Sequence, residues 1–188
     1  VAHFESDVAI SHTKALADKL NRFLGKNIAI KDIYAVQPDM HARFSAISRT
    51  YKYYINKNKN PFTYPFAYRP HPLPDIRLMN NACGLLLRYE DFTSFSKLHT
   101  DVKTNICHLM EANWEETDEQ LVFTIKADRF LRNMVRAIVG TLLDVGQGRI
   151  TLEQFQQIIE SKDRCKAGTS VPGNALFLCD IEYPPCKL

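Results

Sequence analysis

Arginine side chains recur at short spacing in residues 126–146, KADRFLRNMVRAIVGTLLDVG. Each residue of an α-helix turns by about 100°, so Arg129, Arg132 and Arg136 would share one face while apolar residues cover the other. Gly140, one turn after Arg136, would leave the polar face open. The planar guanidinium makes forked contacts with carboxylate or phosphate. The segment predicts a core-anchored helix that presents arginines to an anionic partner, and a solvated basic face is the alternative.

A second segment whose side chains could bind a ligand is HARFSAISRTYKYY at 41–54, which combines basic and aromatic residues. Side chains alternate between the two faces of a strand, so Arg49 and Tyr51 share one face and Lys52 lies on the other. Basic groups around aromatic rings, with Arg43 nearby, are typical of surfaces that stack bases and bind phosphates. An aromatic strand packed on a core is the alternative interpretation.

Other catalytic templates are missing from the sequence. It has no glycine-rich phosphate loop, no GxSxG turn, and no histidine pair at metal-ligand spacing. The five cysteines are odd in number and form no CxxC pair, which predicts reduced thiols in a cytosolic protein. Asp91, in the loop DFTSF, is the most suggestive carboxylate, although a role in the turn itself is favoured.

Composition sets the class of protein. The 188 residues are 45% hydrophobic and carry a formal net charge of +3, which permits a nucleic-acid partner without proving one. No run approaches the roughly 18 apolar residues that span a bilayer. The first residues, VAHFESD, do not resemble a signal peptide and read as a strand already under way, so we expect further sequence upstream.

Helices and hairpins that alternate irregularly would position these residues. The periodicity predicts strands at 1–5, 28–36, 47–55, 106–114, 121–127 and 176–183, and helices at 11–24, 76–88, 152–161 and in the arginine segment up to 146. Asp75 is expected to cap the second helix. Thr151 and Gln154 are expected to form a capping box at the start of the last one. The proline-rich residues 56–75 predict a long surface loop. The fold class is α+β: a mixed, largely antiparallel sheet with helices packed on one face.

Three motifs, HARFSAISRTYKYYI, DFTSF and KADRFLRNMVRAIVGTLLDVG, in this order and at these separations, closely resemble the tRNA pseudouridine synthase A family. The likeness extends upstream through VAHFE and downstream to SVPGNALFLCDIEYP. It implies a pseudouridine synthase-like fold and an isomerase that detaches uracil from its ribose, turns it and rejoins it through carbon. The substrate implied is transfer RNA, modified in the anticodon stem-loop at positions thirty-eight to forty. The resemblance further implies no metal or organic cofactor, a cytoplasmic location and a homodimer.

The resemblance also implies roles for particular residues. Tyr51, in Arg49-Thr50-Tyr51, matches the tyrosine that stacks on the target base, and Arg136, in Met134-Val135-Arg136, matches the arginine that pairs with the nucleophilic aspartate. The residues expected to bind the tRNA are Tyr51, Arg43, Arg49, Lys52 and Arg132. Lys97, Lys103 and Arg129 are expected to add to the phosphate attraction.

The sequence departs from the family at the nucleophile. The family's aspartate lies in a Gly-Arg-Thr-Asp-x-Gly-Val-His motif before the segment that matches Val1, and none of the 188 residues reproduces that motif. We therefore expect residues 1–40 to be the remnant of an N-terminal catalytic half and residues 41–188 to be the C-terminal half, inactive alone. The alternatives are a non-catalytic RNA-binding module that uses the same basic cleft, and a domain whose arginines bind an acidic protein.

Overall fold

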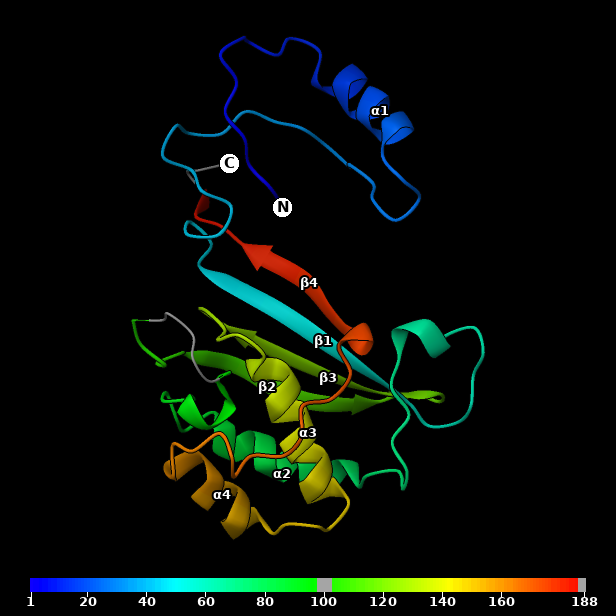
Figure 1. The fold of residues 1–188 in the computed structure, drawn as a ribbon, viewed down its shortest axis with the longest axis vertical. Coiled ribbons are helices and arrows are strands. Elements are labelled where there is room, and N and C mark those ends of the chain that lie inside the picture. Colours follow the sequence, from blue (N-terminus) through cyan, green and yellow to red (C-terminus); the bar gives the residue numbers. More distant parts are fainter. Residues whose placement is uncertain (98–102, 186–188) are drawn as a thin grey trace. The chain divides into compact units, whose positions relative to one another are not determined.

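The chain forms two compact units in the computed structural model, which describes residues 1–97 and 103–185 (Figure 1). One unit comprises Val1–Ala46 with Tyr183–Leu188, and the other comprises Ile47–Glu182. The second unit holds the sheet and the arginine helix, so it carries most of the predicted site. The assignment of residues 1–40 and 41–188 to two halves of an enzyme stays a prediction.

A four-stranded antiparallel sheet forms the frame of the second unit. Its strands are β1 (Ser48–Asn56), β2 (Leu109–Glu116), β3 (Gln120–Ala127) and β4 (Leu176–Glu182), in the order β2-β3-β1-β4. The hairpin β2–β3 supplies one edge, and the last strand of the chain pairs with β1 at the other. The predicted α+β class with an antiparallel sheet is confirmed.

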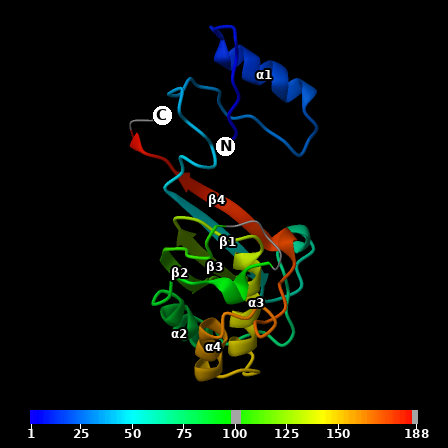
Figure 2. The same cartoon turned by 60° about the vertical axis from the view of Figure 1, so that its left-hand side comes forward.

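Three helices gather on one side of this sheet in both views (Figures 1 and 2). They are α2 (Ile76–Leu86), α3 (Met134–Gly146) and α4 (Leu152–Glu160). The predicted caps are confirmed, because the Asp75 carboxylate accepts the Arg77 amide at 2.8 Å and Thr151 forms a capping box with Gln154. These caps define where α2 and α4 begin.

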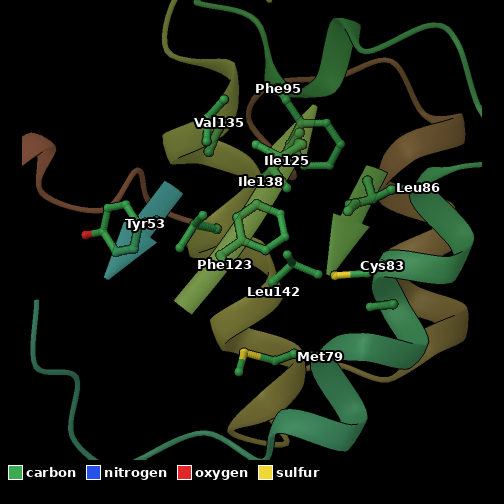
Figure 3. Packing of buried hydrophobic residues seen from close by; sticks show 14 of the residues in the cluster. Tyr53, Met79, Cys83, Leu86, Phe95, Phe123, Ile125, Val135, Ile138 and Leu142 are labelled. Carbon is green, nitrogen blue, oxygen red and sulfur yellow. The ribbon is translucent and has the colours of Figure 1, made fainter. Parts of the chain in front are cut away.

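The core lies between the sheet and the helices (Figure 3). Tyr53 on β1 and Phe123 and Ile125 on β3 are fully buried, and so are Ile138 and Leu142 on α3. Because α3 is buried on nearly every side, its position is fixed by packing rather than by propensity. The side chains in the first turn of α3 are therefore held on a rigid element.

The first unit differs from the prediction. It contains α1 (Thr13–Phe23), close to the predicted 11–24, but the predicted strands at 1–5 and 28–36 are wrong, since the structure has no strand there. A strand exists only within a hydrogen-bonded ladder, and among the described residues no strand pairs with these segments. Their apolar side chains are consequently exposed, as Phe4 and Ile28 are.

The described cysteines are free thiols: Cys83, Cys107, Cys165 and Cys179. Burial raises the pKa of the Cys83 thiol to about 12 and that of Cys107 to about 11, so neither supplies a thiolate near neutral pH. Cys186, also predicted to be reduced, lies outside the described residues.

Candidate active site

Strand β1 presents Tyr51 on the face of the sheet that the helices cover. The predicted alternation holds: Tyr53 and Ile55, on the same face, are fully buried, whereas Tyr51, nearer the start of the strand than they are, is half-buried. Opposite Tyr51 lies Ile125 on β3. The ring of Phe130 meets the Tyr51 ring edge-on, at 5.2 Å between centroids and 89° between planes. Packing therefore fixes the plane of the Tyr51 ring while leaving part of it accessible.

The arginine helix begins later than the sequence predicts. Asn133 adopts a left-handed backbone conformation, with φ at 68°, and α3 starts only at Met134. A right-handed helix cannot continue through that conformation, which asparagine tolerates better than most residues. Arg129 and Arg132 therefore precede the helix, and the predicted row of three guanidiniums on one helical face is wrong. Arg136 alone among the three projects from α3.

Arg136 is tied to a distant segment of chain at two points. Its Nε donates a hydrogen bond to the Val171 carbonyl oxygen at 2.6 Å, and its own carbonyl accepts the Val171 amide at 3.2 Å. The guanidinium also lies against the backbone of Gly173, where an added Cβ would stand 3.7 Å from Cζ, Nε and Nη1. The direction of the Arg136 side chain is thus set by residues that lie 35 or more positions later in the sequence.

Gly140 does not open the surface as predicted. It is buried, and a Cβ there would lie 1.9 Å from the carbonyl oxygen of Thr169. The segment containing Thr169 and Val171 runs directly along the face of α3 that carries Arg136 and Gly140, so this face is partly covered by chain.

A cavity of about 760 Å³ opens beside the first turn of α3. Its walls are Tyr51, Lys97, the run 130–136, Arg164 and Leu176. Four lining side chains are cationic, namely Lys97, Arg132, Arg136 and Arg164, and none of the described lining residues is acidic. Charges of one sign around a concave, partly apolar surface concentrate the field there. The cavity is therefore suited to an anionic ligand that also carries a flat ring for Tyr51.

The other predicted site residues lie outside this cavity. The Arg49 guanidinium donates to the Asp128 carbonyl oxygen at 2.6 Å, which anchors the loop before α3. Lys52 pairs with Thr124 in the ladder and projects from the opposite face of the sheet. Arg43 belongs to the other compact unit, with its Cζ 5.6 Å from the centre of the Phe44 ring.

Of the remaining basic residues expected to attract phosphate, Lys103 and Arg129 are also not among the lining residues. Lys97 is one of them, and its backbone amide donates to the Arg132 carbonyl oxygen at 3.0 Å.

Sequence reasoning missed Arg164. It stands in SKDRCK after α4, where no local pattern separates it from an ordinary surface arginine. Its place in the cavity wall results from the path of the chain back across α3, which is a property of the tertiary structure.

Asp91 has a structural role, in agreement with the turn interpretation. Its Oδ1 accepts the amide and the hydroxyl of Thr93 at 3.1 and 2.6 Å, and its Oδ2 lies 2.8 Å from Lys162 Nζ. Burial raises the pKa of this carboxyl, but the bonds from Lys162 and Thr93 outweigh it and hold the pKa below its ordinary value. Asp91 is also not among the residues that line the cavity.

The described residues contain neither a metal-binding cluster nor a membrane-spanning helix. Within 1–97 and 103–185 no cluster of histidine, cysteine and acidic side chains is arranged to hold a metal ion. No helix in the described part of the chain is long and apolar enough to cross a membrane.

Comparison with known proteins identifies the family. Residues 82–184, which include α3 and the segment that crosses it, match the family model described as tRNA pseudouridine synthase. A tRNA pseudouridine synthase A of Parabacteroides distasonis is 58% identical over 184 residues, covering 98% of this chain and 73% of the relative. Bacteroides thetaiotaomicron has one that is 57% identical, with 98% and 69% covered, and Bacillus subtilis one that is 35% identical, with 97% and 74% covered. The chain belongs to the tRNA pseudouridine synthase A family.

Proposed function

We propose that the cavity beside α3 is the uridine site of a tRNA pseudouridine synthase that acts on the anticodon stem-loop. The observation that carries the proposal is the convergence of Tyr51 and Arg136, from a strand and a helix, on one cationic cavity. Family membership supports transfer RNA as the substrate.

In this proposal the target nucleotide leaves its stack and enters the cavity, because chemistry on a base requires that it be exposed. The uracil ring stacks on Tyr51, whose plane Phe130 fixes. The phosphates flanking the nucleotide lie near Lys97 and Arg132 at the cavity wall. The bond between the ribose and uracil N1 then breaks, the base turns, and the same ribose carbon bonds to uracil C5. C5 loses a proton and N1 gains one, so the product is an isomer of uridine.

Arg136 supplies the fixed positive charge in this scheme. An arginine held through its Nε keeps its two terminal nitrogens for a carboxylate in a forked pair. Such a pair holds the carboxylate ionised and oriented. The nucleophilic aspartate is not assigned to any of the 188 residues, so we propose that this chain alone does not turn over.

The first experiment uses the full product of the gene that encodes this chain and an unmodified tRNA transcript. We expect pseudouridine in the anticodon stem-loop, mapped by chemical probing. RNA binding with steep salt dependence but no pseudouridine anywhere would favour the non-catalytic RNA-binding module instead. The 188-residue chain, assayed in parallel, should bind the RNA without turnover, and turnover would place the nucleophile within these residues.

The second experiment tests Arg136 directly. Arg136→Lys keeps the charge but loses the planar fork, and kcat should fall by about 100-fold or more. Arg149→Lys is the matched control, because Arg149 lies outside the cavity and pairs with Asp144 at 3.0 Å. Near-normal turnover by Arg136→Lys would remove the proposed role.

We also propose a cytoplasmic homodimer. In support, Phe62, Tyr64 and Phe66 in the proline-rich loop are 91%, 76% and 60% exposed, which leaves an apolar surface that a partner could cover. Light scattering of the full gene product over a dilution series tests the dimer, and a monomer at every concentration would exclude it.

A further inference from the structure

The segment Ala167–Val171 connects Arg164 to Arg136. It follows α4 after six intervening residues, runs along α3 past Thr141 and Gly140, and places the Val171 carbonyl oxygen against Arg136 Nε. Because Nε has a single N–H, that carbonyl decides which way the guanidinium plane faces. Anything that fixes the segment therefore also fixes Arg136.

The segment approaches α3 unusually closely at two glycines. The Gly168 amide donates to the Thr141 hydroxyl at 2.9 Å, and a Cβ on Gly168 would lie 2.6 Å from Asp144 Oδ2. Thr169 places its carbonyl oxygen directly over Gly140. Together with the Val171 amide, which donates to the Arg136 carbonyl oxygen at 3.2 Å, these contacts hold the backbone of the segment against the helix.

One side chain, Arg164, binds the segment at three residues. Its Nη1 lies 3.3 Å from the carbonyl oxygens of Ala167 and Gly168, and its Nη2 donates to the Ser170 hydroxyl at 2.9 Å. The planar guanidinium suits this task, because its donors point in fixed, divergent directions. A lysine ammonium lacks that fixed fork.

The Ser170 hydroxyl joins this arrangement to the start of α3. It also accepts a hydrogen bond from Asn133 Nδ2 at 2.6 Å, and Asn133 is the left-handed residue that precedes the helix. Arg164 and Asn133 therefore hold Ser170 from two sides, one residue before the carbonyl that orients Arg136. Both also line the cavity that contains Tyr51 and Arg136.

We propose that Arg164 is a positioning residue, which orients the Arg136 guanidinium for the reaction through Ser170 and the Val171 carbonyl. The inference rests on the proposed function for its catalytic consequence, but the orientation itself can be measured separately. A direct phosphate contact by Arg164 is the competing role, and it predicts a different kinetic change.

The test uses the full gene product with isotope-labelled arginine. The Nε–H signal of Arg136 is assigned by its loss in Arg136→Lys. In Arg164→Gln, exchange of this proton with water should quicken by about tenfold, because the hydrogen bond to Val171 is no longer held in place. Arg77→Gln is the matched control and should leave the exchange rate within about twofold, since Arg77 pairs with Asp75 at the start of α2 and does not line the cavity.

Kinetics provide the second measurement. Arg164→Gln should lower kcat by about 10- to 100-fold at unchanged KM, because a misplaced catalytic group costs rate rather than binding. Arg164→Lys should not rescue the loss. A rise in KM with unchanged kcat would indicate a phosphate contact and overturn the inference. Ser170→Ala, which removes only the hydroxyl link, should show the same two changes to a smaller extent and covers the case in which Arg164→Gln does not fold.

Unchanged exchange of the Arg136 Nε–H in Arg164→Gln and Ser170→Ala would overturn the inference whatever the kinetics. Quicker exchange with unchanged kcat would overturn it too, provided that Arg136→Lys is inactive. If the proposed function is wrong, Arg136→Lys turns over normally. The exchange rate of the Arg136 Nε–H in Arg164→Gln still shows, independently of turnover, whether Arg164 holds the guanidinium.

Discussion

Gly140→Ala is the most direct perturbation of the contact between α3 and the segment that crosses it. The new Cβ would lie 1.9 Å from the Thr169 carbonyl oxygen, closer than real Cβ atoms approach, and 3.0 Å from its carbon, which is also tight. The carbonyl must therefore retreat by about 1 Å. Since the neighbours are backbone atoms rather than a flexible side chain, the whole segment has to shift, and the Val171 carbonyl that orients Arg136 shifts with it.

Two opposing energies decide the effect of Gly140→Ala on stability. Replacing glycine by alanine inside a helix contributes about 0.5–1 kcal/mol in favour of folding. Overpacking a closed interior costs about 1–3 kcal/mol. A contact of 1.9 Å with backbone atoms belongs in the upper part of this range, so the free energy of unfolding should fall by about 1–2 kcal/mol, which lowers Tm by roughly 2–8 °C in a chain of this size. Turnover should fall by about 100-fold, because a shift of about 1 Å at a catalytic group has consequences of that order.

Gly84→Ala is the matched control. Gly84 lies inside α2, it is exposed, and a Cβ there meets nothing within 4 Å. The same change should raise the free energy of unfolding by about 0.5–1 kcal/mol and leave turnover unaltered. Urea denaturation and pseudouridine assays on both variants of the full gene product compare the two sites. If Gly140→Ala is as stable and as active as Gly84→Ala, the close approach of the segment to α3 does not exist.

Two further predictions concern single polar groups. Tyr53→Phe removes the hydroxyl that donates to the Pro172 carbonyl at 2.9 Å in the core, and the free energy of unfolding should fall by about 1–2 kcal/mol; no change would mean that water replaces the hydroxyl. Asp91→Asn should destabilise the protein by about 1 kcal/mol at neutral pH, since it removes the charge that Lys162 meets. Because folding lowers the pKa of the Asp91 carboxyl, that stabilisation is present above the ordinary pKa of about 4 and disappears as pH falls through the pKa of the folded state. The free energies of unfolding of the original protein and of Asp91→Asn should therefore become equal in acid. A difference between them that stays constant with pH would contradict the ion pair.

The elements that sequence patterns could predict are those with strong local signals. The alternation around Tyr51 and the caps at Asp75 and Thr151 all appear in the structure, because each depends on residues that are neighbours in the chain. The strands expected at 1–5 and 28–36 fail for the opposite reason, since a strand needs a partner that local sequence does not reveal.

The candidate site was only partly predictable. Spacing and resemblance point to Tyr51, Arg132 and Arg136, and these three residues line one cavity. Arg164 was missed, because it reaches the site through a crossing of α3 that follows from tertiary packing. Lys52 was expected beside them, yet strand alternation alone already placed it on the other face of β1 from Tyr51.

The spacing of Arg136 and Gly140 has a physical explanation in this crossing. Residues four apart lie one above the other on a helix, so the segment that orients Arg136 must pass over position 140. Any side chain there would lift the Thr169 carbonyl away and move the Val171 carbonyl from Arg136 Nε. Gly140 therefore leaves room for the segment whose Val171 carbonyl, 35 residues after Arg136, accepts the hydrogen bond from Arg136 Nε. An isolated helix could not supply this acceptor, and the hydrogen bond fixes an otherwise flexible arginine side chain.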